Sequence, residues 1–238
     1  MRPARSLDSD VVTSPAPAAV LWDMDGTLVD TEPYWMSAER ELVTSYGGVW
    51  TAADGLALVG SGLQHSASVL RNRGVDLEDT PMIEWLTERV LDQARTTIPW
   101  RPGVRELLLA LSESGIPQAI VTMSMRPLAE HIAHAFASPV FDAIVTGGDV
   151  EHAKPHPEAY LRAAELLGVD PRDCVAIEDS VPGLASATAS GAVVIGVPAH
   201  VAIAPSGSYT LWSTLAGRTI ADITDLFSRE RAAMGGVR

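Results

Sequence analysis

The chain has 238 residues, of which 47% are hydrophobic and 20% are charged, and its formal net charge is −13. This composition is typical of a globular protein and excludes a disordered or low-complexity chain. The acidic balance argues against a nucleic-acid partner, because negative charges repel the phosphate backbone. A single cysteine, Cys174, excludes an internal disulfide and a zinc cluster of cysteines. No apolar run approaches the roughly 18 residues of a membrane helix, so we expect no membrane partner and a cytoplasmic location.

Residues 1–17 are predicted to form a mobile tail. They contain three prolines and lack the apolar stretch of a secretion signal. Five short, largely apolar runs follow along the chain, and none of them alternates between apolar and polar residues. Such runs are typical of strands buried on both faces of a parallel sheet. The predicted strands span residues 18–22, 118–122, 142–146, 174–177 and 192–197.

Helical patterns lie between these strands, at residues 104–114, 127–137, 157–167 and 182–190. The alternation of strands and helices predicts an α/β fold with a doubly wound parallel sheet. It is interrupted after the first strand, where about 95 residues replace the 15–20 that a crossover needs. Amphipathic patterns there predict helices at 33–46, 62–73 and 79–96. We therefore expect a small helical domain, residues 31–97, inserted into a core domain formed by residues 18–30 and 98–238.

Polar side chains follow four of the predicted strands, at the edge where α/β sheets bind their ligands. The first strand is followed by two carboxylates and a turn, the second ends in a hydroxyl, the loop after the third carries an ammonium group, and the fourth is followed by two more carboxylates. The ammonium group belongs to the only lysine in the chain. These residues are Asp23, Asp25, Gly26, Thr27, Thr122, Lys154, Glu178 and Asp179.

Crowded carboxylates raise one another's pKa unless a cation lies among them. Mg²⁺ prefers oxygen ligands and needs only one or two carboxylates besides water and a substrate phosphate. We expect Asp23 and Asp179 to bind Mg²⁺, with Glu178 as an outer or alternative ligand. Thr122 and Lys154 are then placed to hold a phosphoryl group, one as a neutral donor and the other as a charge.

The inserted helical domain offers one candidate substrate contact. A Gly-Ser-Gly turn at residues 60–62 lets the backbone approach a ligand closely. Gln64 and His65 follow this turn and are predicted to contact the substrate.

These motifs, in this order over residues 18–198, resemble the haloacid-dehalogenase-like hydrolase superfamily. The run Asp30-Thr31-Glu32-Pro33 and the helical insert resemble the subfamily with a type-one α-helical cap, which contains sugar-phosphate phosphatases and β-phosphoglucomutases. The resemblance implies that Asp23 is a nucleophile that forms an aspartyl-phosphate, and that Asp25 is the general acid and base. It also implies that Thr122 and Lys154 bind the phosphoryl group. Mg²⁺ would be held by the carboxylates of Asp23 and Asp179 and by the backbone carbonyl of Asp25.

Other reactions of this superfamily can be weighed from the same residues. Phosphonate-cleaving relatives lack the second aspartate and use a cap lysine, and dehalogenases usually have another residue at the Asp25 position. Mutases usually carry an arginine shortly after a glycine of the cap. Counted from Gly60, this position is Leu63 in this chain, although Arg71 or Arg73 is near enough in sequence to replace the arginine.

We predict a Mg²⁺-dependent phosphatase that acts on a small phosphorylated metabolite, with a sugar or polyol phosphate as the leading candidate. Phosphoglycolate and a nucleotide monophosphate remain open as substrates. A β-phosphoglucomutase-like transfer is the alternative reaction, and a non-catalytic protein that binds a phosphorylated ligand is the alternative of another class. The oligomeric state is not predicted.

Overall fold

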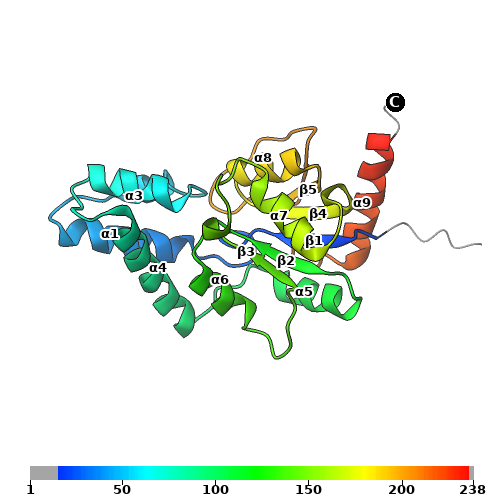
Figure 1. The fold of residues 1–238 in the computed structure, drawn as a ribbon, viewed down its shortest axis with the longest axis horizontal. Helices are drawn as coiled ribbons and strands as arrows, with labels where there is room; N and C mark the ends of the chain where they lie inside the picture. Colours follow the sequence, from blue (N-terminus) through cyan, green and yellow to red (C-terminus); the bar gives the residue numbers. More distant parts are fainter. Residues whose placement is uncertain (1–15, 236–238) are drawn as a thin grey trace, which may run out of the picture.

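The computed structural model describes residues 16–235, so the predicted tail lies outside the described residues except for its last two positions. Six parallel strands form one sheet in the order β3-β2-β1-β4-β5-β6 (Figure 1). The strands are β1 Ala19–Trp22, β2 Gln118–Val121, β3 Ala143–Val145, β4 Cys174–Glu178, β5 Val193–Gly196 and β6 Thr210–Leu211. The expected doubly wound parallel sheet is confirmed, with β1 and β4 at its centre. No helix within residues 16–235 has the length and apolar character needed to cross a bilayer.

Five of the six strands were predicted, and their ends agree with the sequence patterns to within one or two residues. The exception is β6, which has two half-buried residues and is too short to give an apolar run. Two helices were also not predicted, α2 Ala52–Leu56 and α9 Ile220–Gly235. Two short 3-10 turns, Gly147–Asp149 and Pro171–Asp173, complete the connections.

Helices cover both faces of the sheet, which explains why the strands are apolar throughout. Along β1, Val20 and Trp22 pack on one face and Ala19 and Leu21 on the other. The first face is covered by α5 Val104–Glu113, α6 Arg126–Ala133 and α9, and the second by α7 Glu158–Leu167 and α8 Val181–Ser190.

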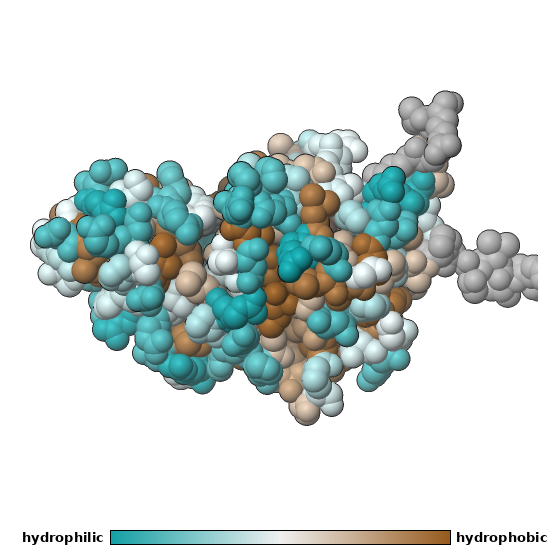
Figure 2. All heavy atoms as spheres, viewed as in Figure 1, coloured by the Kyte–Doolittle hydropathy of each residue, from teal (hydrophilic) through white to brown (hydrophobic). Residues whose placement is uncertain are grey.

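Of the five helices between β1 and β2 in the chain, the first four lie beside the sheet in space (Figure 1). Their buried leucines form a core that is continuous with the first face of the sheet. The surface over α1, α3 and α4 is largely hydrophilic in Figure 2, whereas more apolar surface is seen over the half that holds the sheet. The four helices are α1 Glu32–Ser45, α2 Ala52–Leu56, α3 Leu63–Asn72 and α4 Asp79–Thr96.

The two connections between these helices and the sheet run side by side. The backbone N–H of Asp30 donates to Pro99 O at 2.8 Å, and that of Arg101 donates to Leu28 O at 2.9 Å. Because the first connection starts at the carboxyl end of β1, the four helices are placed beside the sheet edge at which the predicted site residues lie.

Candidate active site

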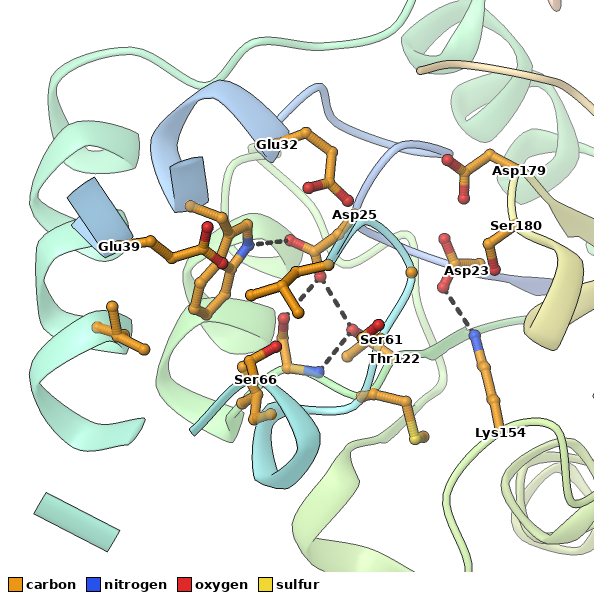
Figure 3. Close-up of a pocket in the computed structure, with 17 residues that line it drawn as sticks. Asp23, Asp25, Glu32, Glu39, Ser61, Ser66, Thr122, Lys154, Asp179 and Ser180 are labelled. Atoms are coloured by element: carbon orange, nitrogen blue, oxygen red, sulfur yellow. Dashed lines mark hydrogen bonds and ion pairs between the residues drawn. The ribbon is translucent and has the colours of Figure 1, made fainter. Parts of the chain in front are cut away.

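A cavity lies between the carboxyl edge of the sheet and the four inserted helices (Figure 3). It has about 660 Å³ of empty space, its open mouth included. The sheet side is lined by Asp23, Asp25, Thr122, Met123, Ser124, Lys154, Asp179 and Ser180. The helical side is lined by Glu32, Trp35, Glu39, Leu58, Gly60, Ser61, Leu63, Ser66 and Leu86.

Asp23 directly follows β1 and is 7% exposed. Its Oδ1 accepts a hydrogen bond from Lys154 Nζ at 2.7 Å, whereas its buried Oδ2 accepts none. Burial and the nearby Glu178 carboxylate raise the pKa of Asp23 to about 7, although Lys154 acts in the opposite direction. A buried carboxylate oxygen without a partner is unfavourable in a folded protein, so Oδ2 is available to a cation or an electrophile.

Lys154 is tied to the sheet edge by three acceptors. Its Nζ donates to Asp23 Oδ1 at 2.7 Å, to Glu178 Oε1 at 2.6 Å and to the Val121 carbonyl at 2.9 Å. Burial alone would lower the pKa of Lys154, but Asp23 and Glu178 outweigh it and raise that pKa above its usual value. The side chain is therefore a fixed positive charge beside Asp23.

Asp25 joins the two sides of the cavity. Its Oδ1 accepts hydrogen bonds from Thr31 Oγ1 at 2.6 Å and Trp35 Nε1 at 3.0 Å, and both donors belong to the start of the helical segment. Its Oδ2 accepts from Thr122 Oγ1 at 3.1 Å and Ser124 Oγ at 2.7 Å, which follow β2. The orientation of this carboxylate therefore depends on the position of α1 relative to the sheet.

Asp179 follows β4 and is also buried. Within residues 16–235, its carboxylate has one polar side-chain contact, a long one from Thr27 Oγ1 at 3.5 Å. Burial, together with Asp23 and Glu178, raises the pKa of Asp179 well above its usual value. Gly26 has a φ of +88°, and a Cβ there would overlap the Asp179 carboxylate, so only glycine fits this turn.

Glu178 has partners on both carboxylate oxygens and does not line the cavity. Oε1 accepts from Lys154 Nζ and from the Tyr160 hydroxyl at 2.8 Å, and Oε2 accepts from Asp179 N at 3.1 Å and Ser180 Oγ at 3.1 Å. A Cβ at Gly183 would overlap this carboxylate. These contacts favour a role in positioning Lys154 over the predicted role as a metal ligand.

The sheet edge fits a hard divalent cation. Carboxylate oxygens of Asp23, Glu178 and Asp179 all lie within 4.8 Å of one another. Because both Glu178 oxygens already have donors, the fit rests on the unpartnered Asp23 Oδ2 and on the weakly bonded Asp179 carboxylate. Oxygen donors of this kind are those that Mg²⁺ prefers.

Gln64 and His65 are exposed and are not among the residues that line the cavity. The Gly-Ser-Gly turn does approach the sheet edge, because a Cβ at Gly60 would lie 2.9 Å from the Ser180 Cβ. In α3, however, the buried face has helical spacing and consists of Leu63, Ser66, Ala67 and Leu70. The two predicted contact residues lie between these positions and so face outward.

Four further residues line the cavity although the sequence motifs predicted no role for them: Glu32, Trp35, Glu39 and Ser124. The first three have the spacing i, i+3, i+7 on α1, which places them on one face of the helix. The sequence signal that could have indicated these residues is the presence of two acidic residues on the otherwise apolar buried face of this helix. Ser124 is two residues after Thr122, and its backbone N–H donates to the Thr122 hydroxyl at 3.0 Å.

The comparisons with known proteins agree with this geometry. A family model of haloacid dehalogenase-like hydrolases matches residues 17–191. Hexitol phosphatase B of Escherichia coli O157:H7 is 31% identical over 217 residues, which cover 89% of this chain and 95% of that protein. Fructose-1-phosphate phosphatase YqaB of Escherichia coli (strain K12) is 32% identical over 182 residues, which cover 76% of this chain and 96% of that protein.

A solved structure of a CbbY variant from Rhodobacter sphaeroides, in complex with xylulose-1,5-bisphosphate, superposes with a TM-score of 0.77. It is 29% identical and covers 87% of this chain and 99% of that one. The predicted resemblance is confirmed, and the chain belongs to the haloacid dehalogenase-like hydrolases.

Proposed function

We propose that this hydrolase is a cytoplasmic, Mg²⁺-dependent phosphatase that cleaves a sugar or polyol phosphate through an aspartyl-phosphate on Asp23. The observation that carries the proposal is the buried, unpartnered Oδ2 of Asp23, a residue that lines the cavity and whose Oδ1 is held by Lys154. Phosphatases of phosphorylated sugars and hexitols among the relatives support this class of reaction.

The proposed reaction has two displacement steps. In the first, an Asp23 carboxylate oxygen forms a bond to phosphorus, the bond from phosphorus to the sugar oxygen breaks, and Asp25 gives that oxygen a proton. In the second, Asp25 takes a proton from water, the water oxygen bonds to phosphorus, and the aspartyl-phosphate bond breaks to release phosphate. A carboxylate nucleophile in this way replaces one difficult displacement with two easier ones.

The residues around Asp25 suit this exchange of protons. The Thr122 and Ser124 hydroxyls donate to the carboxylate in the structure, and hydroxyl groups can rotate to accept when a carboxyl carries the proton. Thr31 and Trp35 fix the other oxygen from the helical side. Closure of the helices over the sheet thus orients Asp25 and excludes bulk water at the same time.

Positive charge at the sheet edge balances the charge of the phosphoryl group. Lys154 lies beside Asp23 and, with Thr122, would hold the phosphoryl oxygens. A Mg²⁺ ion held by Asp23, Asp179 and the backbone carbonyl of Asp25 would supply Lewis-acid stabilisation of the same oxygens. In this proposal residues 18–30 and 98–238 form the catalytic core, and residues 31–97 form the cap.

The helical side favours a phosphatase over a mutase. Leu63, at the position where a mutase would usually have arginine, lines the cavity. Arg71 and Arg73 are exposed, pair with Asp79 and Asp54, and are not among the lining residues. The described part of the cap therefore presents no cation to hold a second phosphate.

Phosphate release from a panel of phosphorylated metabolites tests the proposal. We expect release with Mg²⁺, none after EDTA treatment, and recovery when Mg²⁺ but not the larger Ca²⁺ is returned. Full activity after exhaustive chelation would contradict the metal requirement. A parallel incubation with β-glucose 1-phosphate and trace bisphosphate should yield free phosphate, and glucose 6-phosphate in its place would indicate a mutase.

A further inference from the structure

The two sides of the cavity carry different charges. Among the described lining residues, Lys154 is the only cation, and it belongs to the sheet side, where it is tied to Asp23 and Glu178. The helical side contributes two carboxyl groups, Glu32 and Glu39, and otherwise only serine hydroxyls, glycine, and apolar or aromatic side chains. A part of the substrate that extends toward the helices therefore meets acidic groups and no positive charge.

Glu39 is the least explained of these groups. It is 5% exposed, lines the cavity, and its buried Oε2 has no partner within hydrogen-bond geometry. The Trp50 indole N–H, also buried without a partner, acts on Glu39 from within the chain and lowers its pKa against the effect of burial. Figure 3 places it on the side of the cavity away from Asp23 and Lys154. It lies one helical turn beyond Trp35, whose indole N–H donates to Asp25. A buried polar atom without a partner usually marks a missing water or ligand contact.

We infer that Glu39 binds a hydroxyl of the leaving group, and that the cavity therefore selects monophosphates of uncharged, polyhydroxylated compounds over bisphosphates and phosphorylated carboxylic acids. This inference rests on the proposed phosphatase function, which it refines to a class of substrate. The relatives leave the question open, since they include hexitol and fructose-1-phosphate phosphatases as well as a protein bound to a bisphosphate.

The physical reason is the cost of desolvating charge. An anionic group placed against the helices would lose its water without gaining a cation, and such a group is strongly disfavoured in a buried site. A hydroxyl, in contrast, can both donate to and accept from a carboxyl group, so it satisfies Glu39 in either protonation state. Burial raises the pKa of Glu39 to about 8, which makes the uncharged form accessible near neutral pH.

A matched pair of substrates tests the selection without any mutation. We expect the kcat/KM of phosphate release from fructose 1-phosphate to exceed that from fructose 1,6-bisphosphate by about 100-fold or more at equal free Mg²⁺, because binding sites reject unpaired buried charge strongly. 2-Phosphoglycolate should be disfavoured to a similar degree. Bisphosphate turnover within tenfold of the monophosphate would overturn the inference.

Variants of Glu39 test the hydroxyl contact. Glu39→Leu keeps a similar volume but cannot form hydrogen bonds, whereas Glu39→Gln retains them. Relative to p-nitrophenyl phosphate, whose leaving group offers no sugar hydroxyls, kcat/KM for fructose 1-phosphate should fall about tenfold or more in Glu39→Leu, mainly through KM. Glu39→Gln should restore this ratio to within about threefold. Glu41→Gln, an exposed carboxylate on the same helix, is the matched control and should leave the ratio unchanged.

The outcomes separate the two proposals. If the wild-type protein hydrolyses p-nitrophenyl phosphate but Glu39→Leu keeps the wild-type ratio, the hydroxyl contact is wrong and the phosphatase function stands. If no phosphomonoester at all is hydrolysed in the presence of Mg²⁺, both proposals are wrong. Thermal unfolding of each variant shows whether it is folded, and the comparison of substrates on the wild-type protein does not depend on that result.

Discussion

The two sides of the cavity are built differently. On the sheet side, Asp25, Lys154 and Glu178 each have two or more hydrogen-bond partners at fixed strand ends. The exceptions are one oxygen of Asp23 and the weakly bonded carboxylate of Asp179. On the helical side, leucines alternate with a few polar groups, and one oxygen of Glu39 is left without a partner. Each side therefore has at least one carboxylate that lines the cavity and is not fully hydrogen-bonded. In the proposed function the sheet side holds the groups that react, and in the further inference the helical side selects the leaving group.

This division follows from the secondary structure. Parallel strands end at one edge and are buried on both faces, so the side chains that follow them are held in place by their neighbours. The inserted helices meet that edge through two adjacent connections and through the hydrogen bonds to Asp25. Precise positioning on the sheet side suits catalysis, and a helical side built from a separate segment of the chain allows specificity to vary.

The sharpest test of the sheet side is Asp23→Asn. If Oδ2 is the attacking atom, loss of the carboxylate should lower kcat by at least about 10³-fold on every substrate, as for other catalytic nucleophiles. The melting temperature should not fall, because the substitution removes a buried charge whose pKa is already raised by burial. Residual activity of more than a few per cent would show that Asp23 is not the nucleophile.

Asp25→Asn tests the residue that joins the two sides. General acid and base groups usually contribute about 10²–10⁴-fold, and we expect a loss in this range with a sugar phosphate. The loss should be smaller with an activated aryl phosphate, because its leaving group needs little protonation. Measuring kcat for both substrates checks the assignment, and equal losses would count against a role in proton transfer.

Variants of the adjacent residues Asp179 and Glu178 distinguish binding of the metal from positioning of Lys154. Asp179→Asn should raise the Mg²⁺ concentration needed for half activation by about 10–100-fold, because Asp179 is the proposed direct ligand. Glu178→Gln should mainly lower kcat, since its oxygens hold Lys154 and Tyr160. Mg²⁺ titrations of the two variants at saturating substrate give the comparison. If both shift the Mg²⁺ requirement equally, Glu178 is a ligand, as the sequence analysis predicted.

Much of the fold could be predicted because the sheet is buried on both faces. The five apolar runs and the glycines and prolines between them mark its strands clearly, whereas β6, with two residues, leaves no such pattern. The inserted helices were predicted from their amphipathic spacing. The short helix α2 was not, because five residues are too few to show a period, although its start is capped reciprocally by Thr51 and Asp54.

The sheet side of the site could be predicted for the same reason. Residues that follow consecutive parallel strands must meet at one edge, so their sequence positions determine their proximity. The helical side depends instead on which face of each helix turns toward the cavity. The rotation of α3 places Leu63 and Ser66 inward and Gln64 and His65 outward. That rotation follows from the packing of α3 against α4. The helical spacing of the buried residues in α3 indicates it, whereas the Gly-Ser-Gly turn, on which the prediction rested, does not.

The smallest expected effect concerns the helical side alone. Glu39 has a pKa of about 8 in the folded protein because it is buried, compared with an ordinary value of 4.5. The folded state therefore holds a proton that the unfolded chain releases between these two values. Stability from this group is complete below about pH 4.5 and is lost as the pH rises through 8. Glu39→Gln cannot lose a proton, so its stability relative to the wild type should rise across this interval.

We expect the gain of Glu39→Gln over the wild type to grow by up to about 3 kcal/mol between pH 5 and pH 8, measured by denaturant unfolding at each pH. Glu41→Gln, which removes an exposed partner of Arg89, should show no such trend. Glu32, whose pKa burial and Asp25 also raise to about 8, is present in both proteins and largely cancels in the difference. A difference that does not vary with pH would mean that Glu39 is ionised throughout. The helical side would then carry a permanent negative charge, and its discrimination against anionic leaving groups would become stronger.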